Sequence, residues 1–272
     1  MKKTNTFSTI LLLTLTFIVA IPFLIMIIGS FKPNISLISM PIDLNPFTNL
    51  TLANITKVVK DSDIDIWLKN SMLISLAVSI ITSILSVMAG YAFARIKMRG
   101  SKILFAIVIA TMLMPKQLLL IPNYLVAYKL NLQNTLLGII LTSISPAFGI
   151  FLCRQTISSI PKEIFDAAEM DGSSVIQTLI HIVIPISLSA IGTVAIFSFF
   201  DVFNDYLWQL IMISDKSLKT LPVGIAMFAQ KIQGNKGVQL ALALIGTIPL
   251  SVIFIVFQKF FIKQSTDGSI KG

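Results

Sequence analysis

Between Pro161 and Gly172 the chain reads Pro-Lys-Glu-Ile-Phe-Asp-Ala-Ala-Glu-Met-Asp-Gly, and nine residues later Ile182 to Pro185 read Ile-Val-Ile-Pro. This polar, acid-carrying loop lies between two apolar runs that are each long enough to cross a membrane. A protein made mostly of lipid-soluble helices gains no stability of its own from such a loop. We therefore interpret the loop as a segment that a partner outside the membrane binds.

The composition of the whole chain indicates a membrane protein. Of its 272 residues, 55% are hydrophobic and only 12% are charged, whereas about a quarter of the residues in soluble domains are charged. Several runs reach the roughly 20 apolar residues that a transmembrane helix needs, and lipid forces such runs into helices because it offers no hydrogen-bond partners. The sequence predicts an all-α, polytopic protein with six transmembrane helices, at Phe7–Gly29, Trp67–Ala94, Ile103–Ile121, Leu136–Cys153, Pro185–Met212 and Val238–Phe261.

These runs divide the chain into three parts. We expect a first span and an outer loop in residues 1–66, a core domain of five spans in residues 67–262, and a C-terminal tail in residues 263–272. The core domain contains the polar loop, at residues 154–184. The short connection from Arg95 to Lys102 carries four basic residues and no acid, and such connections stay in the cytoplasm. The polar loop, the tail and both termini are therefore expected to be cytoplasmic.

Charge and residue usage argue against several classes of function. The net charge of +9 comes from basic residues that flank the apolar runs, so we expect membrane lipid rather than nucleic acid as the counter-charge. One histidine and one cysteine do not make a Cys–His nucleophile pair or a zinc site. No phosphate-binding G-x-x-x-x-G-K-[ST] sequence occurs in the chain. We therefore expect no catalytic residue, no metal site and no cofactor in this chain.

The first part of the polar loop has the features of a short amphipathic helix. Proline suits the first turn of a helix and glycine suits the left-handed residue after its end, which predicts a helix over Lys162–Asp171. Apolar and acidic side chains would lie on different sides of this helix. An alternative is a helix lying on lipid headgroups, but such helices carry mainly Lys and Arg on their polar face. We therefore favour a protein partner, since an amphipathic helix in a groove is a common mode of recognition.

The loop resembles the signature of the permease subunits of ATP-binding-cassette importers, which is Glu-Ala-Ala, three residues, Gly, nine residues, then Ile-x-Leu-Pro. Two positions depart from it, since Asp166 stands for Glu and Ile184 stands for Leu. Other segments resemble the carbohydrate-importer permeases, and the last six residues resemble the end of the maltose-type second permease subunit. The positions that match the signature are Asp166-Ala167-Ala168, Gly172, Ile182, Ile184 and Pro185.

This resemblance implies a fold and a set of partners. It implies the binding-protein-dependent importer permease fold in a bacterial cell membrane. The partners would be a second permease subunit in a heterodimer, two cytoplasmic ATPase subunits that bind ATP and Mg²⁺, and an extracytoplasmic solute-binding protein. The cargo would be a mono- or oligosaccharide, with a polyol or a glycerol phosphate ester as alternatives. The helix would couple to an ATPase subunit through Glu163, Phe165, Asp166, Ala167, Ala168, Glu169 and Gly172.

Polar residues inside two of the predicted spans are candidates for the substrate pathway, because ionisable groups in a membrane are expensive. If the fifth span is one helix, then Asp201, Asn204, Asp205 and Trp208 share one of its faces. Acids and amides beside an aromatic ring suit hydroxyl-rich sugars. Gln117, which follows a proline in the third span, is a further candidate. The alternative is that these residues cap the outer end of the span and hold helix–helix contacts.

A secondary transporter driven by protons or ions is the alternative function. Such a transporter would need inverted repeats and a buried acid near the middle of the membrane. Asp201 could serve as that acid, but we find no repeat in the sequence. The acidic loop would also have no purpose in such a protein.

Overall fold

The structure is a computed structural model that describes residues 6–33 and 49–267. Within these ranges the chain forms helices and no strand. It divides into two compact units, one of residues 1–65 and 221–250 and the other of residues 66–220 and 251–272. Residues 34–48 of the predicted outer loop and residues 268–272 of the predicted tail lie outside the described residues.

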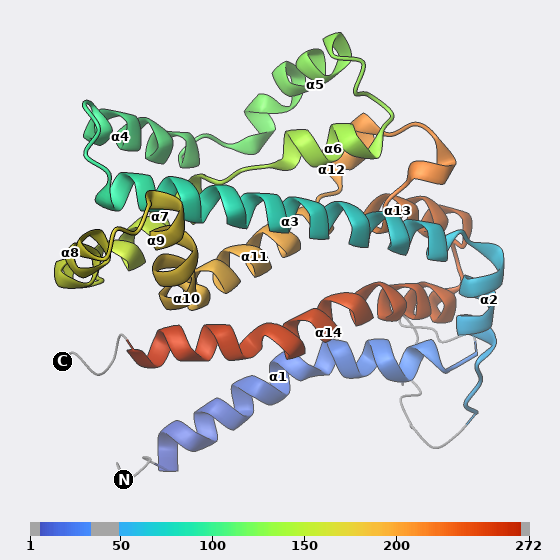
Figure 1. Cartoon of the computed structure of the whole chain (residues 1–272). Coiled ribbons are helices and arrows are strands. Elements are labelled where there is room, and N and C mark those ends of the chain that lie inside the picture. The colour runs from blue at the N-terminus through green and yellow to red at the C-terminus, as the bar shows by residue number, and fades with distance from the viewer. Residues whose placement is uncertain (1–5, 34–48, 268–272) are drawn as a thin grey trace. The chain divides into compact units, whose positions relative to one another are not determined.

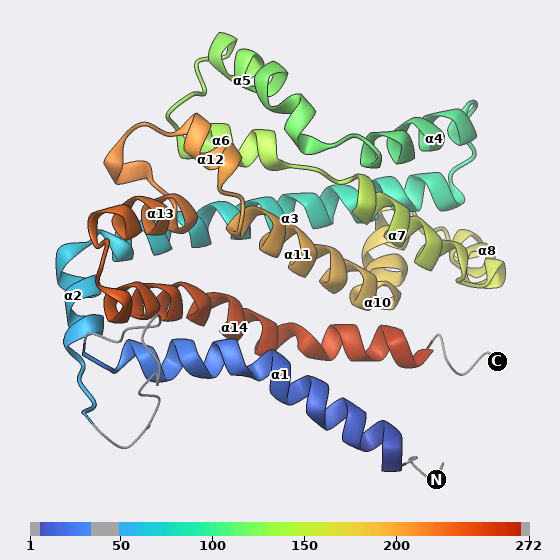
Figure 2. The same ribbon diagram turned by 180° about the vertical axis from the view of Figure 1, so that it is seen from behind.

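The first unit contains α1 (Thr6–Ser30), α2 (Ala53–Asp61), α13 (Leu221–Lys231) and the first part of α14 (Lys236–Asp267). Figures 1 and 2 show α1 alongside this part of α14. The buried side-chain amide of Asn54 donates to the backbone oxygens of Ser30 and Lys32, at 3.1 and 2.8 Å. These two bonds fix the start of α2 to the end of α1.

The second unit is larger and carries both candidate functional regions. Its longest element is α3 (Ile64–Arg95), and the next helices along the chain are short and separated by sharp turns (Figure 1). The remaining helices are α4 (Ser101–Met112), the 3₁₀ helix η1 (Lys116–Leu119), α5 (Leu120–Lys129), α6 (Leu136–Ser143), α7 (Ala147–Ser158), α8 (Lys162–Met170), α9 (Val175–Thr178), the π-helix η2 (Leu179–Val183), α10 (Ile184–Ile186), α11 (Leu188–Phe203), α12 (Leu207–Met212) and η3 (Lys216–Leu218).

A stripe of small polar side chains on α3 lets its neighbours approach closely, as small residues do between membrane helices. A Cβ atom added to Gly149 of α7 would lie 2.1 Å from the Ser86 hydroxyl oxygen. The Ser79 hydroxyl donates to the Ala195 carbonyl of α11 at 2.7 Å. The helix α3 is therefore the centre on which α7 and α11 pack. The buried residues of the stripe are Ser71, Ser75, Ser79, Thr82, Ser83 and Ser86.

Within the described residues, the helices provide up to six membrane-spanning segments by their length and composition. Three are continuous, at Ser8–Ser30, Ile64–Arg95 and Lys236–Val256. The other three are pairs of helices bent at a break, and the bends measure 96°, 46° and 79°. In chain order, these pairs are Ser101–Met112 with Lys116–Lys129, Leu136–Ser143 with Ala147–Ser158, and Val175–Ile186 with Leu188–Phe203.

The prediction that each apolar run forms one helix is wrong for the third, fourth and fifth runs. Pro115 and Pro146 lie in the first two breaks, each directly before the next helix. Proline cannot continue a helix because it lacks the N–H and its ring clashes with the preceding turn. The fifth run turns at Ser187, two residues after Pro185, and its long helix ends at Phe203 rather than at Met212. Apolar length therefore predicted where the spans are, but not that they are broken.

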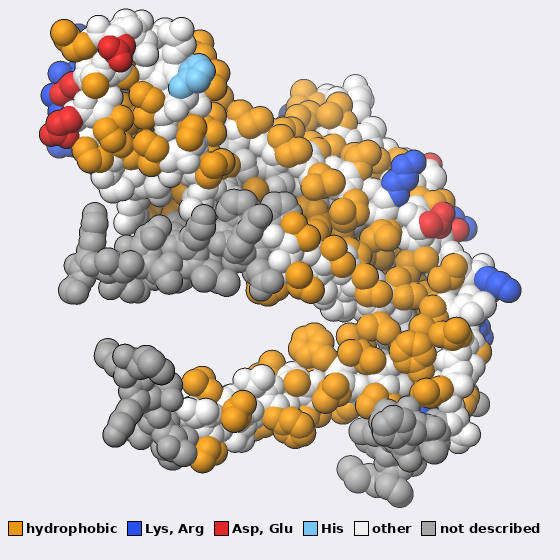
Figure 3. Space-filling view, turned by 60° about the horizontal axis from the view of Figure 1, so that its bottom comes forward, with side chains coloured by type: hydrophobic (Ala, Val, Ile, Leu, Met, Phe, Trp, Pro, Cys, Tyr) orange, Lys and Arg blue, Asp and Glu red, His pale blue; other side chains and the backbone are white. Residues whose placement is uncertain are grey.

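Much of the surface is apolar, as expected for helices in lipid. In α1, for example, Leu12 and Phe17 are each 64% exposed. Figure 3 shows hydrophobic side chains over most of the visible helices, with charged side chains gathered in a few groups. One of these groups lies on the polar loop that contains α8.

Candidate functional site

The helix α8 lies close to the predicted range, and its last residue, Met170, comes one residue before the predicted end. It begins at Lys162, directly after Pro161, and Gly172 beyond its end has a φ of 76°. The Ser173 N–H donates to the Ala168 oxygen at 2.9 Å, and the Gly172 N–H donates to the Glu169 oxygen at 3.0 Å. This pair of bonds is the Schellman motif, which a left-handed glycine favours. The motif fixes the direction in which the chain leaves the helix.

The predicted coupling residues divide between the surface and the interior of the second unit. Phe165 is half-buried and Ala168 is buried, and the Phe165 ring packs against a cluster formed by α3, α7 and α11. The charged groups face solvent, with Lys162 and Asp166 in an ion pair of 3.3 Å. Met170 is 88% exposed at the end of the helix. The exposed members of the predicted set are Glu163, Asp166, Ala167, Glu169 and Gly172.

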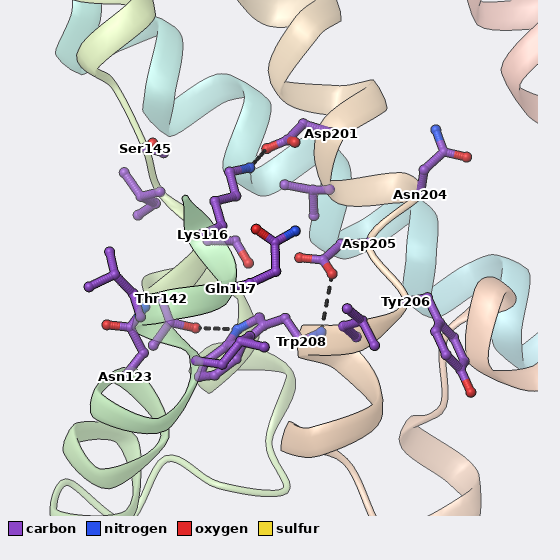
Figure 4. A pocket seen from close by; sticks show the side chains of 16 residues that line it. Lys116, Gln117, Asn123, Thr142, Ser145, Asp201, Asn204, Asp205, Tyr206 and Trp208 are labelled. Carbon is purple, nitrogen blue, oxygen red and sulfur yellow. Dashed lines mark hydrogen bonds and ion pairs between the residues drawn. The ribbon is translucent and has the colours of Figure 1, made fainter. Parts of the chain in front are cut away.

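A cavity of about 730 Å³ lies elsewhere in the second unit, where the third, fourth and fifth predicted spans are broken or end. Figure 4 shows that side chains from all three regions converge on it. It is lined by Lys116, Gln117, Leu119, Leu120, Asn123, Thr142, Ser143, Ile144, Ser145, Asp201, Val202, Asn204, Asp205, Tyr206, Leu207 and Trp208. All five predicted pathway residues are in this lining, so the structure brings them to one cavity.

Two carboxylates and one ammonium group carry the charge of this cavity. Lys116 forms an ion pair with Asp201, so the third span is joined to the fifth, and the two side chains are 62% and 52% exposed. The side chains of Gln117 and Asp205 point into the same space (Figure 4). Asp205 is half-buried. The cavity therefore offers hydrogen-bond acceptors with a formal net charge of −1.

The break after α11 changes how the other pathway residues are placed. The prediction that Asp201, Asn204, Asp205 and Trp208 lie on one helix is wrong, because α11 ends before Asn204 and α12 starts at Leu207. The Asn204 amide donates to the Phe200 oxygen at 2.9 Å and points away from Gln117 (Figure 4). The Asp205 carboxylate instead accepts a hydrogen bond from the Trp208 backbone N–H at 3.1 Å. The carboxylate thus caps α12 and faces the cavity.

Trp208 forms a wall of the cavity rather than an open stacking surface. The residue is 6% exposed and lies in a hydrophobic cluster with Ile74 of α3 and Ile139 of α6. Its indole N–H donates to the Thr142 hydroxyl oxygen at 2.9 Å. Sequence reasoning did not identify Thr142, because no local pattern relates it to a tryptophan 66 residues away.

Replacing Trp208 with phenylalanine is expected to leave uptake nearly unchanged. The ring still fills the cluster, and the loss of one hydrogen bond costs about 1 kcal/mol of stability. Replacement with alanine leaves a cavity in the cluster and should lower the stability by about 3–5 kcal/mol. Thermal unfolding and uptake of the two variants should be compared. An uptake loss in Trp208→Phe as large as that in Trp208→Ala would mean that the indole group itself contacts the cargo.

The comparisons with known proteins agree with this architecture. Residues 82–265 match the family described as the binding-protein-dependent transport system inner membrane component. This chain therefore belongs to that family, and the importer permease fold predicted from the loop is confirmed.

Several relatives and solved structures are similar to this chain over nearly its whole length. The arabinooligosaccharides transport system permease protein AraQ of Halalkalibacterium halodurans is 31% identical over 95% of this chain and 93% of its own length. The trehalose/maltose transport system permease protein MalG of Thermococcus litoralis is also 31% identical, over 92% and 91%. The crystal structure of a bacterial ABC transporter involved in the import of the acidic polysaccharide alginate contains a chain with the same fold. Its TM-score is 0.82 at 22% identity, with 94% and 95% of the two chains covered.

Proposed function

We propose that this chain is a permease subunit of an ATP-binding-cassette importer for a neutral mono- or oligosaccharide. The observation that carries the proposal is α8, an exposed acidic helix held by a Schellman motif in a protein of this family. Two of its relatives are named for arabinooligosaccharides and for trehalose and maltose. The energy for transport would come from ATP, which this chain itself does not bind.

The proposed complex has four kinds of component besides lipid. A second permease subunit pairs with this chain, two cytoplasmic ATPase subunits bind ATP and Mg²⁺, and an extracytoplasmic binding protein delivers the sugar. The chain lies in a bacterial cell membrane with both termini and α8 on the cytoplasmic side. It has no catalytic residue or cofactor of its own. ATP shifts the transporter between two conformations only to the extent that it binds them with different affinity.

The chemistry of the cavity supports a neutral cargo. A sugar hydroxyl can donate to the carboxylates of Asp201 and Asp205, and the Gln117 amide can both donate and accept. Lys116 pairs with Asp201 and also attracts Asp205, so one ammonium group faces two carboxylates and the lining keeps a formal net charge of −1. A uronate or a phosphate ester would meet this negative charge and be repelled. We therefore favour a neutral sugar or a polyol over a glycerol phosphate ester.

Reconstitution of the complex tests the proposed function. The chain should be expressed in its own host with a tag, and the complex should be purified in detergent through that tag. We expect an ATPase subunit to co-purify. Proteoliposomes should then accumulate labelled arabinotriose or maltose only when ATP is inside. Uptake driven by a proton or sodium gradient without an ATPase subunit would overturn the proposal and favour a secondary transporter.

Alanine at Asp205 or Gln117 is expected to lower uptake of the accepted sugar by about tenfold, the effect of losing one strong hydrogen bond. The matched control is Asn204→Ala, because this neighbouring amide points away from the cavity centre. Binding of the ATPase subunit should be unchanged in all three variants. Uptake by the Asp205 and Gln117 variants as fast as that by the wild type would show that the cavity is not on the pathway.

A further inference from the structure

Arg95, the last residue of α3, contacts the end of a second helix. Its guanidinium group donates to the backbone oxygen of Ile157 at 3.0 Å and also to that of Ile160. Ile157 lies in the last turn of α7, and Ile160 lies two residues beyond Ser158, the last residue of that helix. One side chain thus caps α7 from α3.

The same guanidinium group also lies over α8. It is 4.2 Å from the centre of the Phe165 ring, a cation–π contact. On α3, the Tyr91 ring is stacked against Phe165 at 6.3 Å with an interplanar angle of 20°. Arg95 and Tyr91 therefore lie one turn apart on α3 and hold a single aromatic side chain of α8.

The helices α3 and α7 are in such close contact where they cross that they have little room to slide past each other. A Cβ atom added to Gly90 would lie 2.7 Å from the Cys153 Cβ and 2.9 Å from the Arg154 backbone nitrogen. Around this crossing, Val87, Cys153 and Ile157 are buried in one hydrophobic cluster, and Phe165 packs against it. Close-packed interiors of this kind transmit displacement instead of absorbing it.

We propose that Arg95 is the positioning residue that makes the ends of α3, α7 and the helix α8 move as one body during transport. A displacement of α8 would pass from Phe165 to Tyr91 and Arg95 of α3 through the aromatic contacts. From Arg95 it would pass to the end of α7 through the two hydrogen bonds. This inference rests on the proposed function, in which an ATPase subunit moves α8. The inference goes beyond the proposed function because it assigns the contact that transmits the displacement and the two helices, α3 and α7, that receive it.

Arginine is the residue type that can make both the hydrogen bonds to α7 and the contact with the Phe165 ring. Its planar guanidinium group can donate to two carbonyls in its plane while its face covers an aromatic ring. A lysine ammonium group is a compact point charge with no such face. We therefore expect Arg95→Lys to rescue only part of the function that Arg95→Gln loses.

The first test measures coupling in the reconstituted complex, with arabinotriose and maltose as the two probe sugars. In Arg95→Gln, the sugar transported per ATP hydrolysed should fall by about tenfold, within the range seen for mutations along coupling networks. ATP hydrolysis itself should continue. The matched control is Arg154→Gln, because the Arg154 guanidinium lies 3.9 Å from the Phe105 ring centre in a similar contact that does not involve α8. A transport ratio for Arg95→Gln within twofold of the control would overturn the inference.

The second test needs no mutation of Arg95 and no sugar. Spin labels are placed at Gln155 of α7 and Met170 of α8, both exposed, while the native Cys153 is buried. Pulsed electron resonance on the wild-type complex should give the same distance distribution with and without ATP. A shift on ATP binding in the wild type would overturn the inference alone. If the wild-type complex shows no ATP-dependent uptake, the proposed function fails and the inference fails with it.

Discussion

Proline at Gly172 is expected to abolish ATP-driven uptake while the chain still inserts into the membrane. Gly172 has a φ of 76°, whereas proline is fixed near −65°. Proline also lacks the N–H that Gly172 donates to the Glu169 oxygen. The substitution should cost about 3 kcal/mol or more of stability, which is enough to change the backbone at the end of α8. The measurement compares uptake, the amount of chain in membranes and co-purification of the ATPase subunit.

Two other residues at Gly172 provide controls for this prediction. An added Cβ atom there would have no neighbour within 4 Å. The cost of alanine therefore comes only from the left-handed backbone conformation and is about 1–2 kcal/mol of stability. Asparagine tolerates this conformation better than alanine. Uptake should therefore fall in the order Gly, Asn, Ala, Pro. Normal uptake by Gly172→Pro would show that the direction of the chain after α8 does not matter for coupling.

Leucine at Gly149 is expected to prevent folding of the second unit. A Cβ atom at this position would lie 2.1 Å from the Ser86 hydroxyl oxygen, 2.7 Å from the Ser86 Cβ and 2.8 Å from a methyl group of Val194. Because α3 and α11 would both have to move, the cost should exceed the ~1–3 kcal/mol of ordinary overpacking. Fluorescence-detected size exclusion should show aggregated protein, and even alanine should lower the unfolding temperature.

A second substitution can relieve part of this clash. Ser86→Gly removes both of the closest atoms, and the third is a methyl group of Val194. The double variant Ser86→Gly with Gly149→Ala should therefore be more stable than Gly149→Ala alone. Ser86→Gly alone is the control for the loss of the hydroxyl. If the double variant is the least stable of the three, these two helices do not meet as described.

Local sequence patterns predicted the features that depend on a few neighbouring residues. The predicted first span, Phe7–Gly29, lies within one residue of α1 at each end. The ends of α8 were found because proline before a helix and glycine after it each have a local steric reason. Apolar length and capping residues act within one element, so a single sequence is enough to identify them.

Contacts between distant segments were beyond this reasoning. The pairing of Lys116 with Asp201 joins residues 85 positions apart, and nothing near either residue specifies the other. The side of α8 that carries Phe165 was correctly predicted to be apolar, but the sequence does not reveal that Tyr91 and Arg95 cover that ring. A contact of Phe165 with an ATPase subunit stays a prediction, as do the roles of the exposed acids on α8.

The break in the third span has a consequence for where water lies within the membrane. Leu113 is 81% exposed where α4 stops, and the backbone turns by 96° before the next helix. Irregular backbone at membrane depth is tolerated only against protein or water, never against lipid. Lys116 and Gln117, which follow the bend, line the cavity, so water in the cavity can bind the backbone groups that the break leaves free. The cavity is therefore expected to hold water whenever no cargo occupies it.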